Sequence, residues 1–223
     1  VAQTDEYSHM QTSIDHFMYA VPDLEQGVAW AARTFDAVPV YGGEHIGLGT
    51  RAAFLSLGAT YLEIIAPDPG QTLRKNFGGQ LSKLQQGGLV TWIARGDLLP
   101  IANILQAFDI STAGPSRTQR RLDNDALLEW DLLFARGHGF GSRLPFFIDW
   151  LQSPHPATQN PLGGRFDTIT LTTPEPQLLR KILGALNLDI RVTRGTPGIQ
   201  LTVICARGEV LLTSTAQTAR LSL

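Results

Sequence analysis

Residues 14–21 read IDHFMYAV and are followed by Pro22-Asp23. The apolar, β-prone run predicts a buried strand, and the apolar residues from Leu24 to Phe35 recur at helical spacing. Asp23 is expected to cap that helix, because its carboxylate can accept the free N–H groups of the first turn. Three further strands are then predicted, at Val38–Tyr41, Ala52–Leu57 and Tyr61–Ala66. This stretch therefore predicts a β-α-β-β-β module.

The same pattern recurs twice along the chain. A strand at Leu89–Ala94 precedes a cap at Asp97, and a strand at Phe166–Thr172 precedes one at Glu175. We expect βαβββ modules at residues 12–70 and 88–152 and a third, similar module at 165–215, after a tag-like or disordered leader at 1–11. The Gly-, Pro- and Ser-rich segments Pro67–Gly88 and Ser153–Gly164 are predicted linkers.

Composition excludes several classes of protein. The net charge is −2 and there is no basic block, which argues against nucleic-acid binding. No apolar run approaches the roughly 20 residues of a membrane span. A single cysteine, Cys205, excludes an intrachain disulfide and a multi-cysteine zinc site. The first ten residues lack the apolar core of a signal peptide, so a cytoplasmic location is the expectation.

Several short motifs together resemble a known superfamily. They are Ile14-Asp15-His16, Val21-Pro22-Asp23-Leu24, residues 45–51 (HIGLGTR), residues 61–67 (YLEIIAP), residues 144–150 (LPFFIDW) and His155-Pro156. In this order they resemble glyoxalase-like members of the vicinal oxygen chelate superfamily, the glyoxalase/bleomycin-resistance/dioxygenase group. The resemblance implies an α+β fold in which paired βαβββ modules form curled mixed sheets. It covers roughly residues 12–160, and no family residue is carried onto the third module.

The resemblance also implies a divalent metal in the trough between two paired modules. His16 on the first strand and Glu63 on the fourth match the usual pair of ligands in the first module, and Glu63 could also act as the catalytic base. An imidazole and a carboxylate suit Zn, Fe, Mn, Ni or Co. The alternative for His16 is a structural histidine with satisfied hydrogen bonds.

The second module departs from this pattern. Val90 or Thr91 stands opposite His16 when Asp23 is aligned with Asp97, so a second histidine or glutamine ligand is missing. Asp149 lies near the equivalent of Glu63 and is a candidate metal ligand, but a register slip of one residue would turn it to the other face. His45 and His155 are the other candidates for completing the site.

Two glycine-rich stretches each hold a histidine before a strand, at residues 42–50 and 137–143. Either could cradle a ligand, because glycine allows a close backbone approach, and a plain hairpin turn is the alternative. Arg143 could clamp a substrate carboxylate with two hydrogen bonds, or form a structural salt bridge. Trp150 could floor the trough beneath an apolar or aromatic ligand.

Two functions remain open from the sequence. The first is a glyoxalase-like enzyme, a lyase or isomerase acting on a small organic molecule, with or without a divalent metal. The second is a protein that binds or sequesters a small molecule without chemistry, as bleomycin-resistance proteins do, and the missing second-module ligand favours it. The unpaired third module could associate with a second chain, so a homodimer is a further expectation compatible with either.

Overall fold

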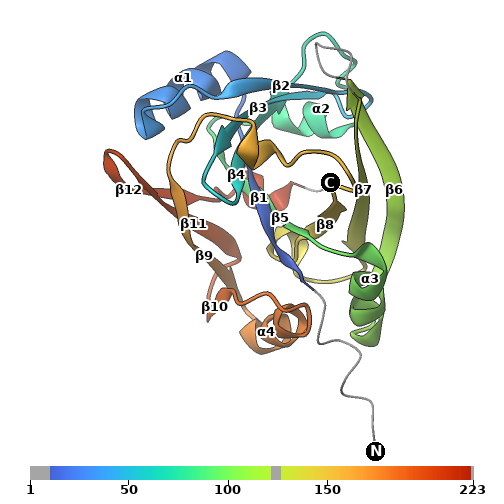
Figure 1. Cartoon of the computed structure of the whole chain (residues 1–223). Coiled ribbons are helices and arrows are strands. Elements are labelled where there is room, and N and C mark those ends of the chain that lie inside the picture. Colours follow the sequence, from blue (N-terminus) through green and yellow to red (C-terminus); the bar gives the residue numbers. More distant parts are fainter. Residues whose placement is uncertain (1–10, 122–126, 222–223) are drawn as a thin grey trace, which may run out of the picture.

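The computed structural model describes residues 11–121 and 127–221, and the expected leader lies outside these residues apart from Gln11. Along the chain, strands and helices follow the order β-α-β-β-β three times, with one extra helix after the first set (Figure 1). The first set comprises β1 (Ser13–Ala20), α1 (Leu24–Phe35), β2 (Val40–His45), β3 (Thr50–Ser56) and β4 (Tyr61–Pro67), followed by α2 (Phe77–Leu81). The second comprises β5 (Gly88–Arg95), α3 (Leu98–Ala107), β6 (Ser111–Arg121), β7 (Leu127–Arg136) and β8 (Phe146–Asp149). The third comprises β9 (Arg165–Thr173), α4 (Pro176–Ala185), β10 (Arg191–Arg194), β11 (Gly198–Cys205) and β12 (Gly208–Thr213).

The helix caps follow from the sequence. The Asp23 carboxylate accepts the Gln26 backbone N–H at 2.8 Å, and the Asp97 carboxylate accepts that of Leu99 at 3.2 Å. Glu175 precedes α4 without a side-chain cap bond, and Pro176 begins that helix instead. These three positions start each helix directly after the first strand of its set.

The first two modules share one eight-stranded sheet. Its order is β2-β3-β4-β1-β5-β8-β7-β6, so β1 and β5 lie side by side and antiparallel at the centre. In each module the first strand also pairs in parallel with the last, β1 with β4 and β5 with β8. The two modules are therefore arranged alike on either side of the β1–β5 pair, and the sheet curls around one hollow face (Figure 1).

One face of this sheet carries the helices and the main core. Phe17, Leu62 and Trp92 are fully buried there, against apolar residues of α1 and α3 such as Ala31 and Ile101. The amphipathic spacing of those helices supplies this contact.

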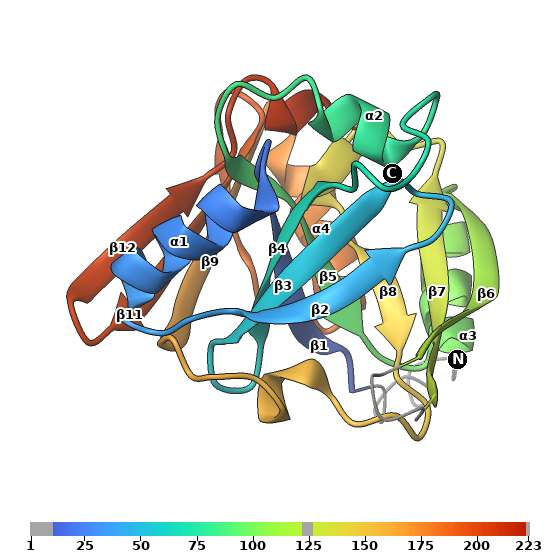
Figure 2. The same ribbon diagram turned by 90° about the horizontal axis from the view of Figure 1, so that it is seen from above.

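The third module packs on the same, outer face. Phe166 of β9 contacts the ring of Phe17 at 5.0 Å between centroids, and the β11–β12 hairpin lies beside α1 (Figure 2). The Cys205 thiol at the end of β11 contacts the Thr34 carbonyl at 3.7 Å, and Arg207 pairs with Asp36 at 2.7 Å. The third module thus covers the outer side of the sheet and leaves the hollow side open.

The third module repeats the order of elements but pairs its strands differently. Its four-stranded sheet has the order β10-β9-β11-β12, so β9 lies between β10 and β11 instead of pairing with the last strand. Element order is local and can be read from the sequence, whereas strand pairing depends on which edges other segments cover.

We call the hollow face of the eight-stranded sheet the trough. Its buried apolar side chains come from both modules and include Met18, Phe54, Tyr61, Val90, Ile93, Trp130 and Ile148. Phe77 and Leu81 of α2 pack against them, so the predicted linker Pro67–Gly88 folds over part of the trough. The other predicted linker, Ser153–Gly164, contains one 3-10 turn at Pro156–Thr158.

The contact between α2 and the β2–β3 hairpin is close. Gly78 donates its N–H to the Leu48 carbonyl at 2.8 Å. A Cβ at Gly78 would lie 1.8 Å from the Gly49 carbonyl oxygen, so only glycine allows this approach. The hairpin tip that carries His45 is therefore held in place by α2.

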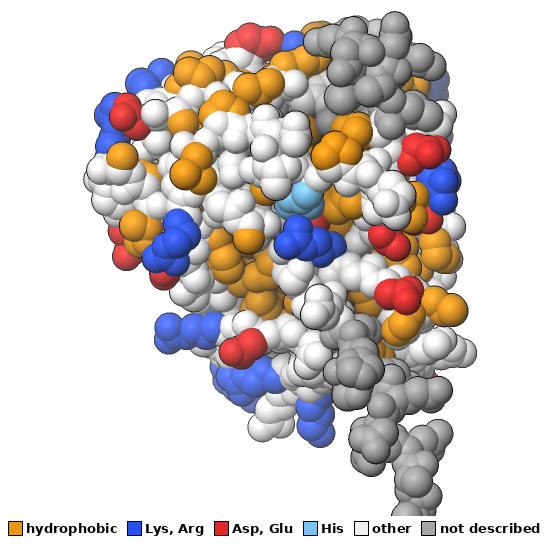
Figure 3. Space-filling model, in the orientation of Figure 1, with side chains coloured by type: hydrophobic (Ala, Val, Ile, Leu, Met, Phe, Trp, Pro, Cys, Tyr) orange, Lys and Arg blue, Asp and Glu red, His pale blue; other side chains and the backbone are white. Residues whose placement is uncertain are grey.

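The surface carries both signs of charge. Figure 3 shows basic side chains over β10 and α4 at one end of the visible face, with acidic side chains among and above them. Among the described residues, no helix has the length and apolar character needed to cross a membrane.

Candidate functional site

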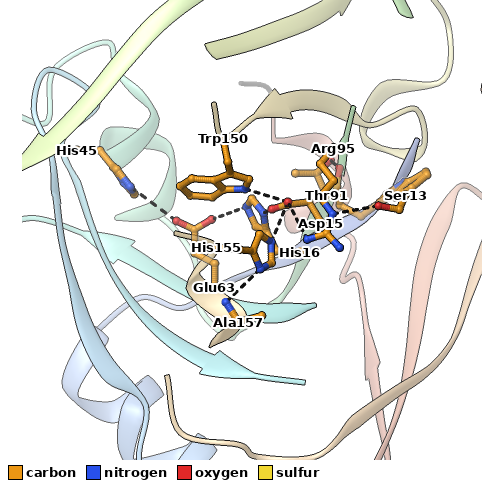
Figure 4. Close-up of polar contacts among 11 residues, drawn as sticks. Ser13, Asp15, His16, His45, Glu63, Thr91, Arg95, Trp150, His155 and Ala157 are labelled. Atoms are coloured by element: carbon orange, nitrogen blue, oxygen red, sulfur yellow. Dashed lines mark hydrogen bonds and ion pairs between the residues drawn. The ribbon is translucent and has the colours of Figure 1, made fainter. Parts of the chain in front are cut away.

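A cluster of titratable side chains lies in the trough of the first module (Figure 4). His16 of β1 and Glu63 of β4 are each 5% exposed, and the His16 Nε2 atom lies 3.5 Å from Glu63 Oε2. The register explains the meeting, because His16 pairs with Tyr61 and the side chain two positions further along β4 points to the same face. The structure thus brings together the two residues that the sequence analysis singled out.

Asp15 holds His16 from the other side. Asp15 Oδ1 lies 2.6 Å from His16 Nδ1, and its side chain is fully buried. Neighbouring residues on a regular strand point to opposite faces, but the β1–β5 register shifts between Ile14 and His16, which marks a β-bulge at Asp15. The bulge allows the Asp15 carboxylate to reach the imidazole of the next residue.

Two residues that follow β8 also contact Asp15. The indole N–H of Trp150 donates to Asp15 Oδ2 at 2.9 Å, and His155 Nε2 lies 2.9 Å from the same oxygen. The Arg95 guanidinium is 4.0 Å away. Trp150 and Arg95 also line an open cleft of about 800 Å³, so they join that cleft to the buried carboxylate. Trp150 and His155, which were expected to bind a substrate, therefore contact Asp15.

His45 approaches Glu63 from the hairpin tip. Its Nε2 atom lies 3.8 Å from Glu63 Oε1, and its Nδ1 atom lies 3.0 Å from the hydroxyl of the buried Thr50. The His45 side chain is 23% exposed, which makes this the more open side of Glu63. Figure 4 shows the Glu63 carboxylate between His45 and His16.

The environment shifts the pKa values of this cluster. Burial alone would lower the pKa of His16, but the hydrogen bonds and negative charges of Asp15 and Glu63 outweigh it and raise the pKa to about 9. Burial alone would raise the pKa of Asp15, but hydrogen bonds with His155 and His16 outweigh it and hold that pKa well below its usual range. His16 is thus a cation at neutral pH, placed between two carboxyl groups.

Two expected site residues lie elsewhere. The Asp149 carboxylate accepts the Leu151 N–H at 2.9 Å, while its neighbour Ile148 faces the trough, so the one-residue register slip occurs and removes Asp149 from the cluster. Arg143 is buried in the 3-10 turn Gly141–Arg143, where it donates to the Gly139 carbonyl at 3.4 Å.

Glu63, His16 and His45 have donor atoms that suit a divalent metal, but each imidazole approaches a different oxygen of the carboxylate. His16 meets Oε2 and His45 meets Oε1, so the carboxylate separates the two imidazoles. Within residues 11–121 and 127–221, no three His, Cys, Asp or Glu side chains form a group that could hold a metal ion. The arrangement as it stands is suited to holding and moving protons.

Comparison with known proteins identifies the family. The sequence matches the model of the family described as Glyoxalase-like domain over residues 14–186. The chain belongs to the glyoxalase-like domain family. Comparison with the curated proteins finds no match.

Comparison with solved structures gives matches at low sequence identity. A hypothetical protein from Staphylococcus aureus is 17% identical with a TM-score of 0.63, over 91% of this chain and 85% of that one. Methylmalonyl-CoA epimerase from Mycobacterium tuberculosis is 20% identical with a TM-score of 0.47, over 65% of this chain and 91% of that one. A Streptomyces coelicolor methylmalonyl-CoA epimerase variant is 18% identical with a TM-score of 0.45, over 60% and 94%.

For this glyoxalase-like chain, sequence reasoning missed the role of Asp15. The residue was part of the Ile14-Asp15-His16 motif that supported the resemblance, but the sequence analysis assigned no role to it. The only signal in the sequence was that Asp15 directly precedes His16. The β-bulge that brings the two side chains together has no clear signature in residues 13–16.

Proposed function

We propose that this glyoxalase-like protein is an enzyme that moves a proton on a small carbonyl compound bound in the trough, a reaction of the isomerase or lyase type. The observation that carries the proposal is the Glu63 carboxylate, buried between two imidazoles, one of which is fixed by Asp15. Perturbed titratable groups that converge in a hollow are typical of acid–base sites.

Glu63 takes the role of the base in this proposal. A carboxylate oxygen accepts the proton from the carbon beside the substrate carbonyl, and the electron pair of the broken C–H bond moves onto the carbonyl oxygen as an enolate. The His16 cation, 3.5 Å from Glu63, stabilises that negative charge, since fixed charges in a dry site act strongly. The proton then returns to the carbon, as in an isomerase, or a neighbouring group leaves, as in a lyase.

Asp15 and His45 support this step without reacting themselves. Asp15 keeps the Nε2 side of His16 directed at Glu63 by holding Nδ1. His45 lies on the more exposed side of Glu63, where a substrate would enter, and Thr50 fixes its ring. No step is assigned to a divalent metal, because no three His, Cys, Asp or Glu side chains of the described residues form a group that could hold one.

Hydrogen–deuterium exchange tests the proposed step. The full chain is incubated in D₂O with a panel of 2-hydroxy ketones, 2-oxo acids and acyl thioesters, and the loss of the C–H signal beside the carbonyl is followed by NMR. We expect at least one compound to exchange, and Glu63→Gln to slow that exchange about 10²–10⁴-fold, the usual range for losing a positioned base. Glu44→Gln, at an exposed glutamate of β2 in the same module, is the matched control and should exchange at the wild-type rate.

The same experiment addresses non-catalytic binding. That alternative is favoured by the second module, whose contribution to the trough is apolar at Val90, Ile93, Phe146 and Ile148. If members of the panel bind and none exchanges, the protein is a binder and the enzymatic proposal is wrong. Metal analysis of untagged protein, with His16→Ala as the comparison, tests whether a divalent metal belongs to the site.

A homodimer is the remaining proposal from the sequence. Strand β2 is an edge of the large sheet and exposes Val40 and Tyr41, and the following tip exposes Ile46 and Leu48. Exposed apolar edges of this kind favour association. Size-exclusion chromatography with light scattering should give twice the chain mass, and Val40→Lys should return it to the monomer; a monomeric wild type contradicts the expectation.

A further inference from the structure

The linker after β8 brings a further histidine to the buried cluster of the first module. The His155 side chain is 15% exposed, and its Nε2 atom lies 2.9 Å from Asp15 Oδ2. His16 contacts the other oxygen of the same carboxylate, so two imidazoles share Asp15 (Figure 4). The steps proposed at Glu63 give His155 no part, and its contacts indicate what that part is.

The local turn fixes which nitrogen of His155 carries a proton. His155 caps the 3-10 turn Pro156–Thr158, and its Nδ1 atom accepts the Ala157 backbone N–H at 3.3 Å. A ring nitrogen that accepts a hydrogen bond holds no proton, so the proton of the neutral ring is on Nε2. His155 is therefore an uncharged donor to Asp15.

The donors at Asp15 Oδ2 leave Oδ1 for His16. Besides His155, the Trp150 indole N–H donates to Oδ2 at 2.9 Å, whereas His16 Nδ1 lies 2.6 Å from Oδ1. The Arg95 guanidinium is 4.0 Å from Oδ2, which is beyond hydrogen-bond distance. A carboxylate that is held at both oxygens cannot rotate without breaking a hydrogen bond, so the direction of Oδ1 is fixed.

The packing of the rings holds the same arrangement. The His16 ring stacks on the Tyr61 ring at 4.4 Å between centroids, with 14° between their planes. The His155 ring makes T-shaped contacts with Tyr61 at 5.5 Å and with Trp150 at 5.8 Å. Tyr61 is only 3% exposed, so both imidazoles lie against one buried ring. Neither can turn without displacing a neighbour.

We propose that His155 is a positioning residue for the reaction at Glu63, and that it acts through Asp15 to keep the His16 ring directed at the Glu63 carboxylate. The inference rests on the proposed function. It gives the segment that follows β8 a part in a reaction whose acid–base groups all come from the first module. A misplacement of about 1 Å can cost about a hundredfold in rate, so the effect is large enough to measure.

Two substitutions of His155 separate positioning from a merely structural role. His155→Gln keeps an N–H that can donate to Asp15, whereas His155→Leu has no donor. In the hydrogen–deuterium exchange assay, His155→Leu should lower the maximal rate about 10–100-fold and leave KM within about twofold, because the change acts on His16 and not on the bound compound. His155→Gln should stay within about threefold of the wild type, because it retains the donor.

His138 provides a matched control. Its Nδ1 atom accepts the Phe140 N–H at 3.2 Å, the same local contact that His155 makes with Ala157, but His138 lies in the loop between β7 and β8. His138→Leu should therefore leave the maximal exchange rate within about twofold of the wild type, because only a turn contact is lost.

An NMR measurement reads the position of His16 without any reaction. In protein with ¹⁵N-labelled histidine, the hydrogen bond to Asp15 should protect the His16 Nδ1 proton from exchange with water. Exchange of that proton should be about tenfold faster or more in His155→Leu and close to the wild type in His155→Gln, since a hydrogen bond to a charged group contributes about 1.5–3 kcal/mol. His155 itself should show its proton on Nε2.

The two readouts distinguish the possible failures. If no compound undergoes exchange, the proposed function is wrong, and the His16 signal alone decides whether His155 fixes that ring. An unchanged rate and signal in His155→Leu, or equal losses in His155→Gln and His155→Leu, would overturn the proposal. A raised KM with an unchanged maximal rate would show instead that His155 contacts the compound, and a proton on His155 Nδ1 would contradict its role as a donor to Asp15.

Discussion

The first and second modules have the same topology but opposite chemistry on their inner surfaces. The first places His16, Glu63 and His45 in the trough, whereas the second fills the matching positions with Val90, Ile93 and Ile148 and carries its histidine and arginines in a loop. The two modules therefore share their strand topology and differ in the chemical character of the side chains that face the trough. Topology fixes where side chains can converge, and the residue types decide what they do there.

Replacing the buried Asp15 should give the largest difference in stability between variants of the first and second modules. Asp15→Asn should lower the free energy of unfolding by about 3–5 kcal/mol, because Trp150, His155 and His16 lose their shared buried anion. Asp131→Asn, on β7 of the second module, breaks the exposed pair with Arg117 and should cost no more than about 1 kcal/mol. Urea denaturation of both variants measures the difference. Equal losses would contradict the view that Asp15 organises the first module.

The two modules should also respond to pH with opposite signs. The pKa of His16 is raised to about 9 from 6.5, so its stabilising contribution is complete below about pH 6.5 and is lost as the pH rises through 9. The loss should approach about 3 kcal/mol in the free energy of unfolding between these values. Burial lowers the pKa of His138, so its contribution is present above pH 6.5 and declines on acidification.

Denaturation series from pH 5 to 10 on two single variants check these signs. His16→Gln should flatten the decline between pH 6.5 and 9, and His138→Gln should leave that decline in place. A wild-type curve that rises over this range would show that His16 is not held as a cation.

The smallest expected effect is on stability, when one glycine in or beside each module is replaced by alanine. Gly78→Ala should cost about 1–3 kcal/mol, because the new methyl group meets the Gly49 carbonyl and displaces the hairpin tip that carries His45. Gly139→Ala places its methyl group in open space and should change stability by no more than about 0.5 kcal/mol. Thermal or urea unfolding measures both, and an effect of equal size would contradict the tight α2 contact.

Much of the fold was accessible from the sequence. The periodicity of residues 14–35 and its recurrence predicted the order of elements, and the caps at Asp23 and Asp97 lie where expected. Pairing in the third module was not accessible, because β9 has the same local pattern as β1 and its neighbours are set by long-range contacts.

The candidate site was predictable in part for similar reasons. The period-2 alternation of strands was enough to bring His16 and Glu63 to one face, and the structure places them 3.5 Å apart. The bulge at Asp15, the fold of α2 over the trough and the turn of Asp149 away from it depend on register shifts of a single residue or on packing between distant segments. Such features leave little trace in local composition.

The alternation along β1 has a practical consequence. Phe17 faces the outer core, where it supports the helices and the third module, while His16 and Met18 on either side face the trough. Residues that pack in the outer core therefore alternate with residues that face the candidate site along one short strand. Substitutions at the trough positions of β1 would therefore change the candidate site while the core contacts of Phe17 stay in place. Natural divergence of the site could proceed in the same way.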